Sequence, residues 1–466
     1  MALAMASPAA AQAGPAATAV TPRAAPSRTL QAWNMPPAQV STWGLGDAAA
    51  QALNAPFWGM QEITGGDSVA HDMFGNAVAV SGATAVVGAS SANVDGRTEQ
   101  GAAYVYTRQN GVWTQTAKLV ASDGTSEDYF GYAVAIDGDT IAVGAWDHNS
   151  DRVDGGVYIF TRTGGTWSQT AKLAPGDQGA AISSFGKAVA LAGPSMVLVG
   201  APDALTCDAN NENCITGAVY VFQDDAGAWS QTQKFSANET VWADHFGTAL
   251  AVSAGDTLLV GDPADDFNGF QAGAAYLFRL TNGLWGETQQ LIPDSIEEHG
   301  AFGSAVALDG NMALVSAAGA TVNGVTDSGT VYAFRQSDGT WSQVQKLQGL
   351  QAATGAGIAF GASLALSGKT ALVGAPWDSL TANDEQGSAY LFTRTGCSWV
   401  QQQRLSLGAS AHFEDNFGIA VALDGGDSAL AGAWGRSVGG NTSQGAVYAF
   451  TDNDSLFADG FEDGCM

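Results

Sequence analysis

A pair of short motifs recurs seven times along this chain and constrains its fold more than any other feature. A Phe-Gly pair is followed 14 or 15 residues later by Gly-Ala or a close variant, and successive Phe-Gly pairs lie 55 to 61 residues apart. The fifth copy has Ser316 in place of the glycine, and the fourth has Asp262 in place of the alanine. The Phe-Gly pairs begin at Phe74, Phe130, Phe185, Phe246, Phe302, Phe360 and Phe417. Such a period indicates seven copies of one supersecondary unit.

The pattern inside each copy predicts four strands. Each copy contains four short runs rich in valine, alanine, leucine and aromatic residues, bounded by Gly, Asp, Asn or Ser, which is typical of strands between turns. No stretch sustains an apolar period near 3.6, so few helices are expected. Four-stranded units repeated around an axis form a β-propeller. We therefore predict an all-β fold, a seven-bladed β-propeller, over residues 56–451.

The two ends of the repeat region favour a closed ring. The seventh copy stops at Phe450, after its third strand, and lacks the tryptophan-containing strand that ends the other copies. The segment FWGMQEI, residues 57–63, has the spacing of that missing strand relative to Phe74. We predict that it completes the seventh blade, because closure removes exposed sheet edges.

The segments outside the repeats suggest export. Residues 1–13 end in Ala-Gln-Ala, the pattern of a signal-peptide cleavage site, although a plain Ala/Pro-rich leader is the alternative. Residues 14–55 are predicted to be an Ala/Pro-rich linker, and residues 452–466 a C-terminal tail. We expect a secreted protein, or one at the cell surface or outer envelope.

Four cysteines fit an oxidising compartment. Cys207 and Cys214 bracket six residues of one loop, and we predict a disulfide between them. Cys397 and Cys465 either form a second pair or stay free.

The motifs resemble a known family. Two features are similar to the FG-GAP repeats of integrin α-subunit propellers and their bacterial relatives. They are the intact Gly-Ala-Pro at 200–202 and 374–376 and the Gly-Ala-Val-Tyr-Val-Phe at 217–222. The resemblance implies a bacterial propeller used for extracellular or surface binding and implies no chemistry. In calcium-binding members the loop between the first two strands is similar to an EF-hand loop. Here that connection is a tight turn such as residues 137–140, so those calcium sites are not carried over.

Strand order assigns the loops to two faces. The loops from second to third strands (2–3 loops) and those from a fourth strand to the next blade (connecting loops) emerge together, and we call this side the loop face. It contains 28 of the 45 acidic residues and three basic ones. Recurring bases lie instead in the fourth strands, where we interpret them as protection of the sheet edge; they are Lys118, Lys172, Lys234, Lys346 and Arg404.

The acidic net charge restricts the classes of partner that this chain can bind. A net charge of −28 makes nucleic acid an unlikely ligand, and the chain has no apolar run long enough to span a membrane. The loop face would attract cations or basic partners, while the simpler interpretation is that Asp forms turns and the charge maintains solubility. We expect a monomer with a protein or glycan ligand on this face.

Two groups of loop-face residues are candidate ligand contacts. A calcium ion could be bound by oxygens of Asp147, Asn149, Asp151 and Asp154, although this segment lacks the Gly and Glu of a full EF-hand loop and an ordinary turn is the alternative. Aromatic side chains could stack on a sugar or anchor a peptide, or simply fill space between blades. These aromatic candidates are Trp146, Trp242, Trp377 and Trp434.

We therefore predict a binding or adhesion module without catalytic residues. The alternative from another class is a carbohydrate-active lyase or hydrolase, because all five histidines fall on the predicted loop face and His71, His148 and His245 adjoin an acidic residue. A structural surface protein is a third possibility. No nucleophile elbow, zinc motif or phosphate loop is present in the sequence.

Overall fold

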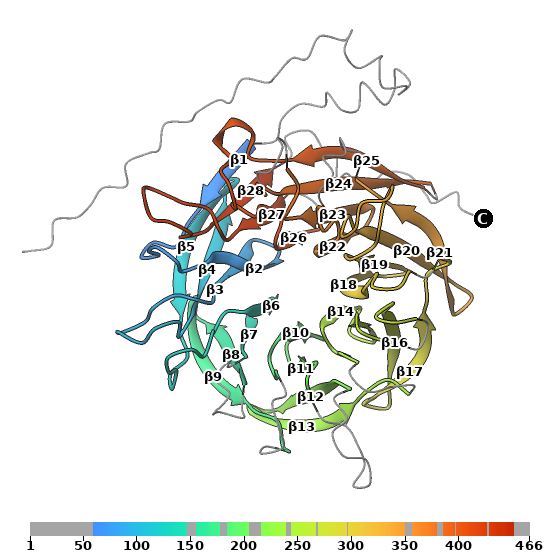
Figure 1. The fold of residues 1–466 in the computed structure, drawn as a ribbon. Helices are drawn as coiled ribbons and strands as arrows, with labels where there is room; N and C mark the ends of the chain where they lie inside the picture. The colour runs from blue at the N-terminus through green and yellow to red at the C-terminus, as the bar shows by residue number, and fades with distance from the viewer. Residues whose placement is uncertain are drawn as a thin grey trace, which may run out of the picture. The chain divides into compact units, whose positions relative to one another are not determined.

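A computed structural model describes residues 59–146, 155–177, 184–204, 216–238, 244–266, 269–295, 297–349, 357–379, 385–396, 398–425 and 428–451. They form seven four-stranded antiparallel sheets arranged around an axis (Figure 1). The described part contains one short 3₁₀ turn, η3 (Gly408–Ser410). The predicted all-β, seven-bladed propeller is confirmed.

Each blade runs outward from the ring axis in chain order. Blade 1 contains β2 (Phe74–Ser81), β3 (Thr84–Ala89), β4 (Ala102–Gln109) and β5 (Val112–Leu119). Blade 2 contains β6 (Ala133–Asp137), β7 (Thr140–Ala145), β8 (Gly156–Thr163) and β9 (Thr166–Leu173). Blade 3 contains β10 (Ala188–Leu191), β11 (Met196–Ala201), β12 (Ala218–Asp225) and β13 (Ala228–Phe235).

The remaining blades repeat this order. Blade 4 contains β14 (Ala249–Ser253), β15 (Thr257–Asp262), β16 (Ala274–Thr281) and β17 (Leu284–Leu291). Blade 5 contains β18 (Phe302–Asp309), β19 (Met312–Ala317), β20 (Thr330–Ser337) and β21 (Thr340–Leu347). Blade 6 contains β22 (Ser363–Ser367), β23 (Thr370–Ala375), β24 (Ser388–Thr395) and β25 (Ser398–Leu405). Blade 7 contains β26 (Val421–Leu423), β27 (Ser428–Ala433), β28 (Ala446–Thr451) and β1 (Gly59–Ile63).

The outer strand of blade 7 comes from the start of the described chain. β1 pairs antiparallel with β28 in a register that runs from Gly59 opposite Thr451 to Ile63 opposite Val447. The Gln61 side chain also exchanges two hydrogen bonds with the backbone of Trp113 in blade 1, both 2.8 Å long. Gln233, Gln289 and Gln345 make the same pair of bonds to the next blade's tryptophan.

Contacts between neighbouring blades explain the spacing of the two motifs. A Cβ added to Gly88 would lie 2.0 Å from the carbonyl oxygen of Gly131, so the second-strand glycine gives the next blade's Phe-Gly turn room to approach. Gly131 itself has φ +94°, a backbone conformation that favours glycine. In blade 5 the missing glycine is Ser316, whose hydroxyl instead accepts a hydrogen bond of 2.9 Å from the Ala305 N–H. The Phe-Gly and Gly-Ala motifs are therefore the two halves of one inter-blade contact.

The core lies between blades and is rich in aromatic side chains. In every blade the phenylalanine of the Phe-Gly pair packs edge-on against the third-strand tyrosine, with ring centroids 5.3 to 5.8 Å apart. All seven of these phenylalanines are buried. This repeated burial of large rings stabilises the ring of blades and leaves the loops free to vary.

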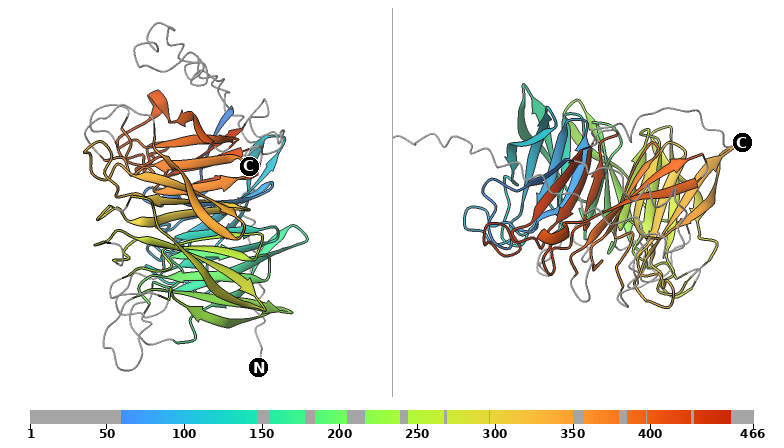
Figure 2. Two further views of the ribbon diagram at one scale, coloured as in Figure 1. Left: turned by 90° about the vertical axis from the view of Figure 1, so that its right-hand side faces the viewer. Right: turned by 90° about the horizontal axis from the view of Figure 1, so that it is seen from above.

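The two faces of the propeller differ in their connections. Tight hairpins link first to second and third to fourth strands on one side, and the longer loops of the loop face lie on the other (Figure 2). No helix of the described ranges is long and apolar enough to cross a bilayer.

Candidate functional site

The loops of the loop face are joined to one another around the ring. In the described parts of six blades, the 2–3 loop lies against the connecting loop that leads into the next blade, as the His71 N–H shows by donating to the carbonyl oxygen of Thr442 at 2.9 Å. The same arrangement joins His299 to Phe270 at 3.0 Å. Backbone hydrogen bonds of this kind give the loop face a fixed framework on which side chains can be displayed.

Among the residues that the structure describes, four large apolar side chains are exposed on this framework. Phe413 is 60% exposed, Phe270 56%, Val69 49% and Trp377 46%. The Phe270 ring packs edge-on against the His299 ring, with centroids 5.1 Å apart. Exposed aromatic side chains within polar surroundings are typical anchors of protein interfaces.

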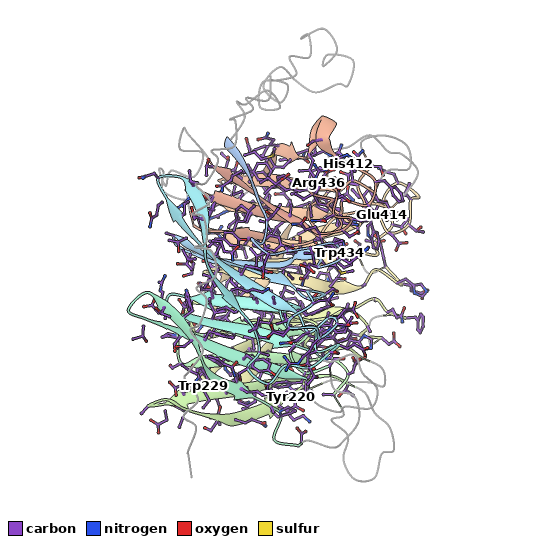
Figure 3. All side chains as sticks on the ribbon, turned by 90° about the vertical axis from the view of Figure 1, so that its left-hand side faces the viewer. Tyr220, Trp229, His412, Glu414, Trp434 and Arg436 are labelled. Atoms are coloured by element: carbon purple, nitrogen blue, oxygen red, sulfur yellow. The ribbon has the colours of Figure 1, made fainter. Side chains whose placement is uncertain are left out.

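The candidate tryptophans fall into different environments. Trp377 is exposed. Trp146 is half-buried, because the Tyr132 ring lies 5.0 Å from it and the Lys187 ammonium lies 5.2 Å from its centroid. Trp434 is also half-buried (Figure 3). Trp242 lies outside the described residues.

The four described histidines belong to four different connecting loops and are all exposed. The His245 ring nitrogen lies 3.8 Å from a carboxylate oxygen of Asp203. His412 contacts the Arg436 guanidinium, and its ring lies 4.0 Å from the Asp415 carboxylate. His148 lies outside the described residues. The structure therefore places the four described histidines apart and does not bring them together into one site.

A tyrosine, an acid and a base meet repeatedly at the border of the loop face. In blade 1 the Tyr104 hydroxyl donates to Asp67 at 2.9 Å, and the Lys118 ammonium lies 2.6 Å from the same carboxylate. The ammonium also lies over the tyrosine ring, 5.3 Å from its centroid. Burial opposes ionisation of Asp67, but the hydrogen bonds from Lys118 and Tyr104 outweigh it and lower the pKa of this carboxyl.

This arrangement gives the fourth-strand bases a second role beside protection of the sheet edge. Blades 2 and 3 repeat the blade 1 contacts, blade 5 pairs Lys346 with Glu297 at 3.7 Å, and blade 6 pairs Arg404 with Asp378 at 2.6 Å. The bases thus neutralise loop-face acids and cover tyrosine rings, in addition to placing charge on the outer strand. The net charge of the loop face is accordingly smaller than the count of its own residues suggested.

Blade 7 inverts the charges of this arrangement. The fourth-strand position is occupied by Glu62, which accepts a hydrogen bond of 2.7 Å from the Tyr448 hydroxyl. The base comes from the 2–3 loop instead, because Arg436 lies 3.0 Å from Asp415. Both side chains are buried, at 11% and 1% exposure, and Figure 3 shows Arg436 beside His412 on the loop face.

Blade 4 brings three acids together. Asp244, Asp262 and Asp265 are each 0% exposed, and one carboxylate oxygen from each lies within 4.8 Å of the others. The Tyr276 hydroxyl donates to Asp265. The fourth-strand position is occupied by Gln290, a neutral amide, which donates to the Tyr276 hydroxyl at 3.1 Å. Burial, and then the neighbouring Asp244 and Asp265, raise the pKa of Asp262 well above its ordinary value.

Sequence reasoning missed this cluster, although a signal was present. Asp262 replaces the alanine that the other six copies carry at this position, and Gln290 replaces the fourth-strand base. The alignment of the seven copies already shows the first departure and, extended to the fourth strand, the second as well. It would not have shown that Asp244, from the preceding connecting loop, lies beside them.

Several predicted sites lie outside the described residues. They are the calcium candidates Asp147, Asn149, Asp151 and Asp154, and the four cysteines Cys207, Cys214, Cys397 and Cys465.

Comparison with known proteins assigns the repeats to a family. The profile of the FG-GAP repeat matches seven segments, residues 58–106, 113–160, 167–222, 229–278, 285–334, 341–392 and 399–450. The chain therefore belongs to the FG-GAP repeat family. Each match begins with the outer strand of one blade and ends with the third strand of the next. A search of curated proteins found no match.

Proposed function

We propose that this FG-GAP repeat protein is an exported or cell-surface binding module that recognises its partner through the loop face. The fold is a general type of protein-binding scaffold. The observation that carries the proposal is the presence of exposed Phe270, Trp377 and Phe413 on a face whose loops are held by backbone hydrogen bonds. Rigid aromatic side chains supply contact area at a low entropic cost.

The charge around these side chains favours a partner with a basic surface. Exposed acids surround the ring of loops, and they come from blades 1, 5 and 6 and from the connecting loops into blades 2, 5 and 7. They include Asp95, Glu127, Glu298, Asp327, Glu385 and Glu414. Acidic surfaces of this kind speed association with basic partners and make it sensitive to salt. A protein partner is therefore favoured over a neutral glycan.

The catalytic alternative has less support from the geometry. A glycosidase or lyase needs its acid and base on either side of one bond, whereas the described histidines lie in four separate connecting loops. The contacts of His412 and His245 with neighbouring charged groups are local to their loops.

The test compares exposed apolar side chains on the two sides of the molecule. The full chain is screened on arrays of basic peptides and of glycans, and the hits are measured by biolayer interferometry. Phe270→Ala, Trp377→Ala and Phe413→Ala are combined in one variant. The matched control combines Leu284→Ala and Val400→Ala, because these outer-strand residues are 56% and 46% exposed.

We expect the loop-face variant to weaken binding of basic peptides at least about tenfold, the scale of a hot-spot loss. Binding by the control should be unchanged, and added salt should weaken binding by the native chain. Equal binding by the native chain and the loop-face variant would refute the proposal. Hits confined to neutral glycans would shift the partner class, and product release from any glycan would favour the enzyme.

A further inference from the structure

We propose that Asp244, Asp262 and Asp265 bind a calcium ion, which occupies the place of the basic side chain that the other six blades provide. The site lies in blade 4 at the base of the loop face. It is separate from the 147–154 segment that the sequence suggested, and it does not depend on the proposed binding function.

The geometry of the carboxylates suits one ion. Each of the three residues contributes an oxygen, and these oxygens lie within 4.8 Å of one another. Oxygens on opposite sides of a calcium ion with bonds of about 2.3–2.6 Å are about 4.6–5.2 Å apart. Magnesium forms bonds of about 2.0–2.1 Å and retains several waters. Because all three carboxylates are 0% exposed, calcium fits this site better.

An oxygen of Asp262 provides an independent indication of a ligand. Its Oδ1 accepts a hydrogen bond of 2.9 Å from the His245 N–H. The Ala264 backbone N–H also faces this carboxylate, yet Oδ2 is buried and no donor among the described residues forms a hydrogen bond to it. A buried carboxylate oxygen without a donor is costly, and a cation between the converging carboxylates would supply the missing interaction.

Comparison of the seven blades shows that this one has lost its own base. Five blades place Lys or Arg in the fourth strand at this height, and blade 7 supplies Arg436 from its 2–3 loop. Blade 4 has Gln290 in the strand and Asp265 in the loop. It has also gained Asp262 where the other copies have alanine. An added acid and a lost base at one place are expected of a cation site.

The ion would connect two loops of the loop face. Asp244 belongs to the connecting loop that precedes blade 4, while Asp262 is the last residue of β15 and Asp265 lies in the 2–3 loop that follows it. Calcium binding would thus fix both loops relative to the blade.

The experiment is calorimetric titration of the chelator-treated full chain with CaCl₂, together with thermal melting with and without calcium. The main variant is Asp262→Ala, which introduces the residue that the other six copies carry and should therefore fold. Asp256→Ala is the matched control, because Asp256 lies in the β14–β15 hairpin at the opposite side of the same blade. A second control combines Asp147→Ala with Asp151→Ala.

We expect saturable calcium binding and a raised melting temperature in the native chain and in both controls. Asp262→Ala should weaken this binding at least about tenfold, since affinity follows the number of charged ligands. Gln290→Lys should also weaken it, while raising the melting temperature of the calcium-free protein. Absence of any binding, or full binding by Asp262→Ala, would overturn the proposal. Loss of binding only in the 147 and 151 variant would place the ion there instead.

Discussion

Blades 4 and 7 use the same positions of the repeat for opposite electrostatic solutions. Blade 7 places Arg436 against the buried Asp415 at 3.0 Å, so its charge is balanced by protein side chains. Blade 4 places Asp265 at the position of Arg436, Asp244 at the position of Asp415, and Asp262 beside both. The comparison teaches that the propeller scaffold accommodates opposite sets of buried charged side chains at equivalent positions.

The largest expected effect comes from breaking the pair in blade 7. Arg436→Leu would leave Asp415 buried without its base, which should lower the free energy of unfolding by about 3–5 kcal/mol. Urea unfolding at neutral pH measures this loss. The control Arg279→Leu removes an arginine that is 54% exposed and pairs with Asp256 at 2.9 Å, and it should cost no more than about 1 kcal/mol.

The pH dependence of the stability of Arg436→Leu tests whether the unpaired charge of Asp415 causes the loss. Burial already raises the pKa of Asp415 despite the opposing effects of its hydrogen bonds and Arg436. Without the arginine that pKa should rise further, so the folded state holds the proton more tightly than the unfolded state. The stability deficit of Arg436→Leu should therefore shrink as the pH falls. A deficit that is independent of pH would indicate lost packing instead.

The next largest loss of stability should come from replacing the second-strand glycine, and it should be equal in blades 4 and 7. A Cβ at Gly261 of blade 4 would lie 2.0 Å from the Gly303 carbonyl oxygen, and one at Gly432 of blade 7 would lie 2.0 Å from that of Gly75. Gly261→Ala and Gly432→Ala should each cost about 1–3 kcal/mol through overpacking. Gly286→Ala is the control, because a Cβ there meets nothing within 4 Å. Markedly unequal costs, measured by urea unfolding, would show that the blades differ in their scaffold as well as in their charges.

The smallest effect comes from making blade 2 resemble blade 4. Lys172→Gln introduces the amide that blade 4 carries and removes the 2.7 Å pair with Asp123. Both side chains are more than one third exposed, so the expected cost at neutral pH is at most about 1 kcal/mol.

Lowering the pH should remove the stability difference between the native chain and Lys172→Gln. Burial opposes ionisation of Asp123, but hydrogen bonds from Lys172 and Tyr158 lower its pKa below the ordinary 3.8. Its contribution to stability is therefore present above that ordinary value and is lost as the pH falls through the lowered pKa. Melting curves of both proteins across the acid range measure this, and a difference that persists in strong acid would contradict the electrostatic explanation.

The sequence by itself determined the scaffold. The seven Phe-Gly and Gly-Ala pairs fixed the number of blades, the four runs per copy fixed the strands, and the strand order assigned the loops to their face. These features are local, because turn residues and strand patterns act over a few neighbouring positions. Repetition then makes each local signal appear seven times, which makes it easy to detect.

Only the tertiary structure decided which side chains of different segments meet. Lys118 is a surface base in its strand pattern, yet it contacts Asp67 of the connecting loop at 2.6 Å. Asp262 is one substitution in a motif until Asp244 and Asp265 are found beside it. Such contacts depend on how the strand order brings loops together and on the depth at which each side chain is buried. The energy of a charge depends on those distances and that burial, and the sequence pattern contains neither.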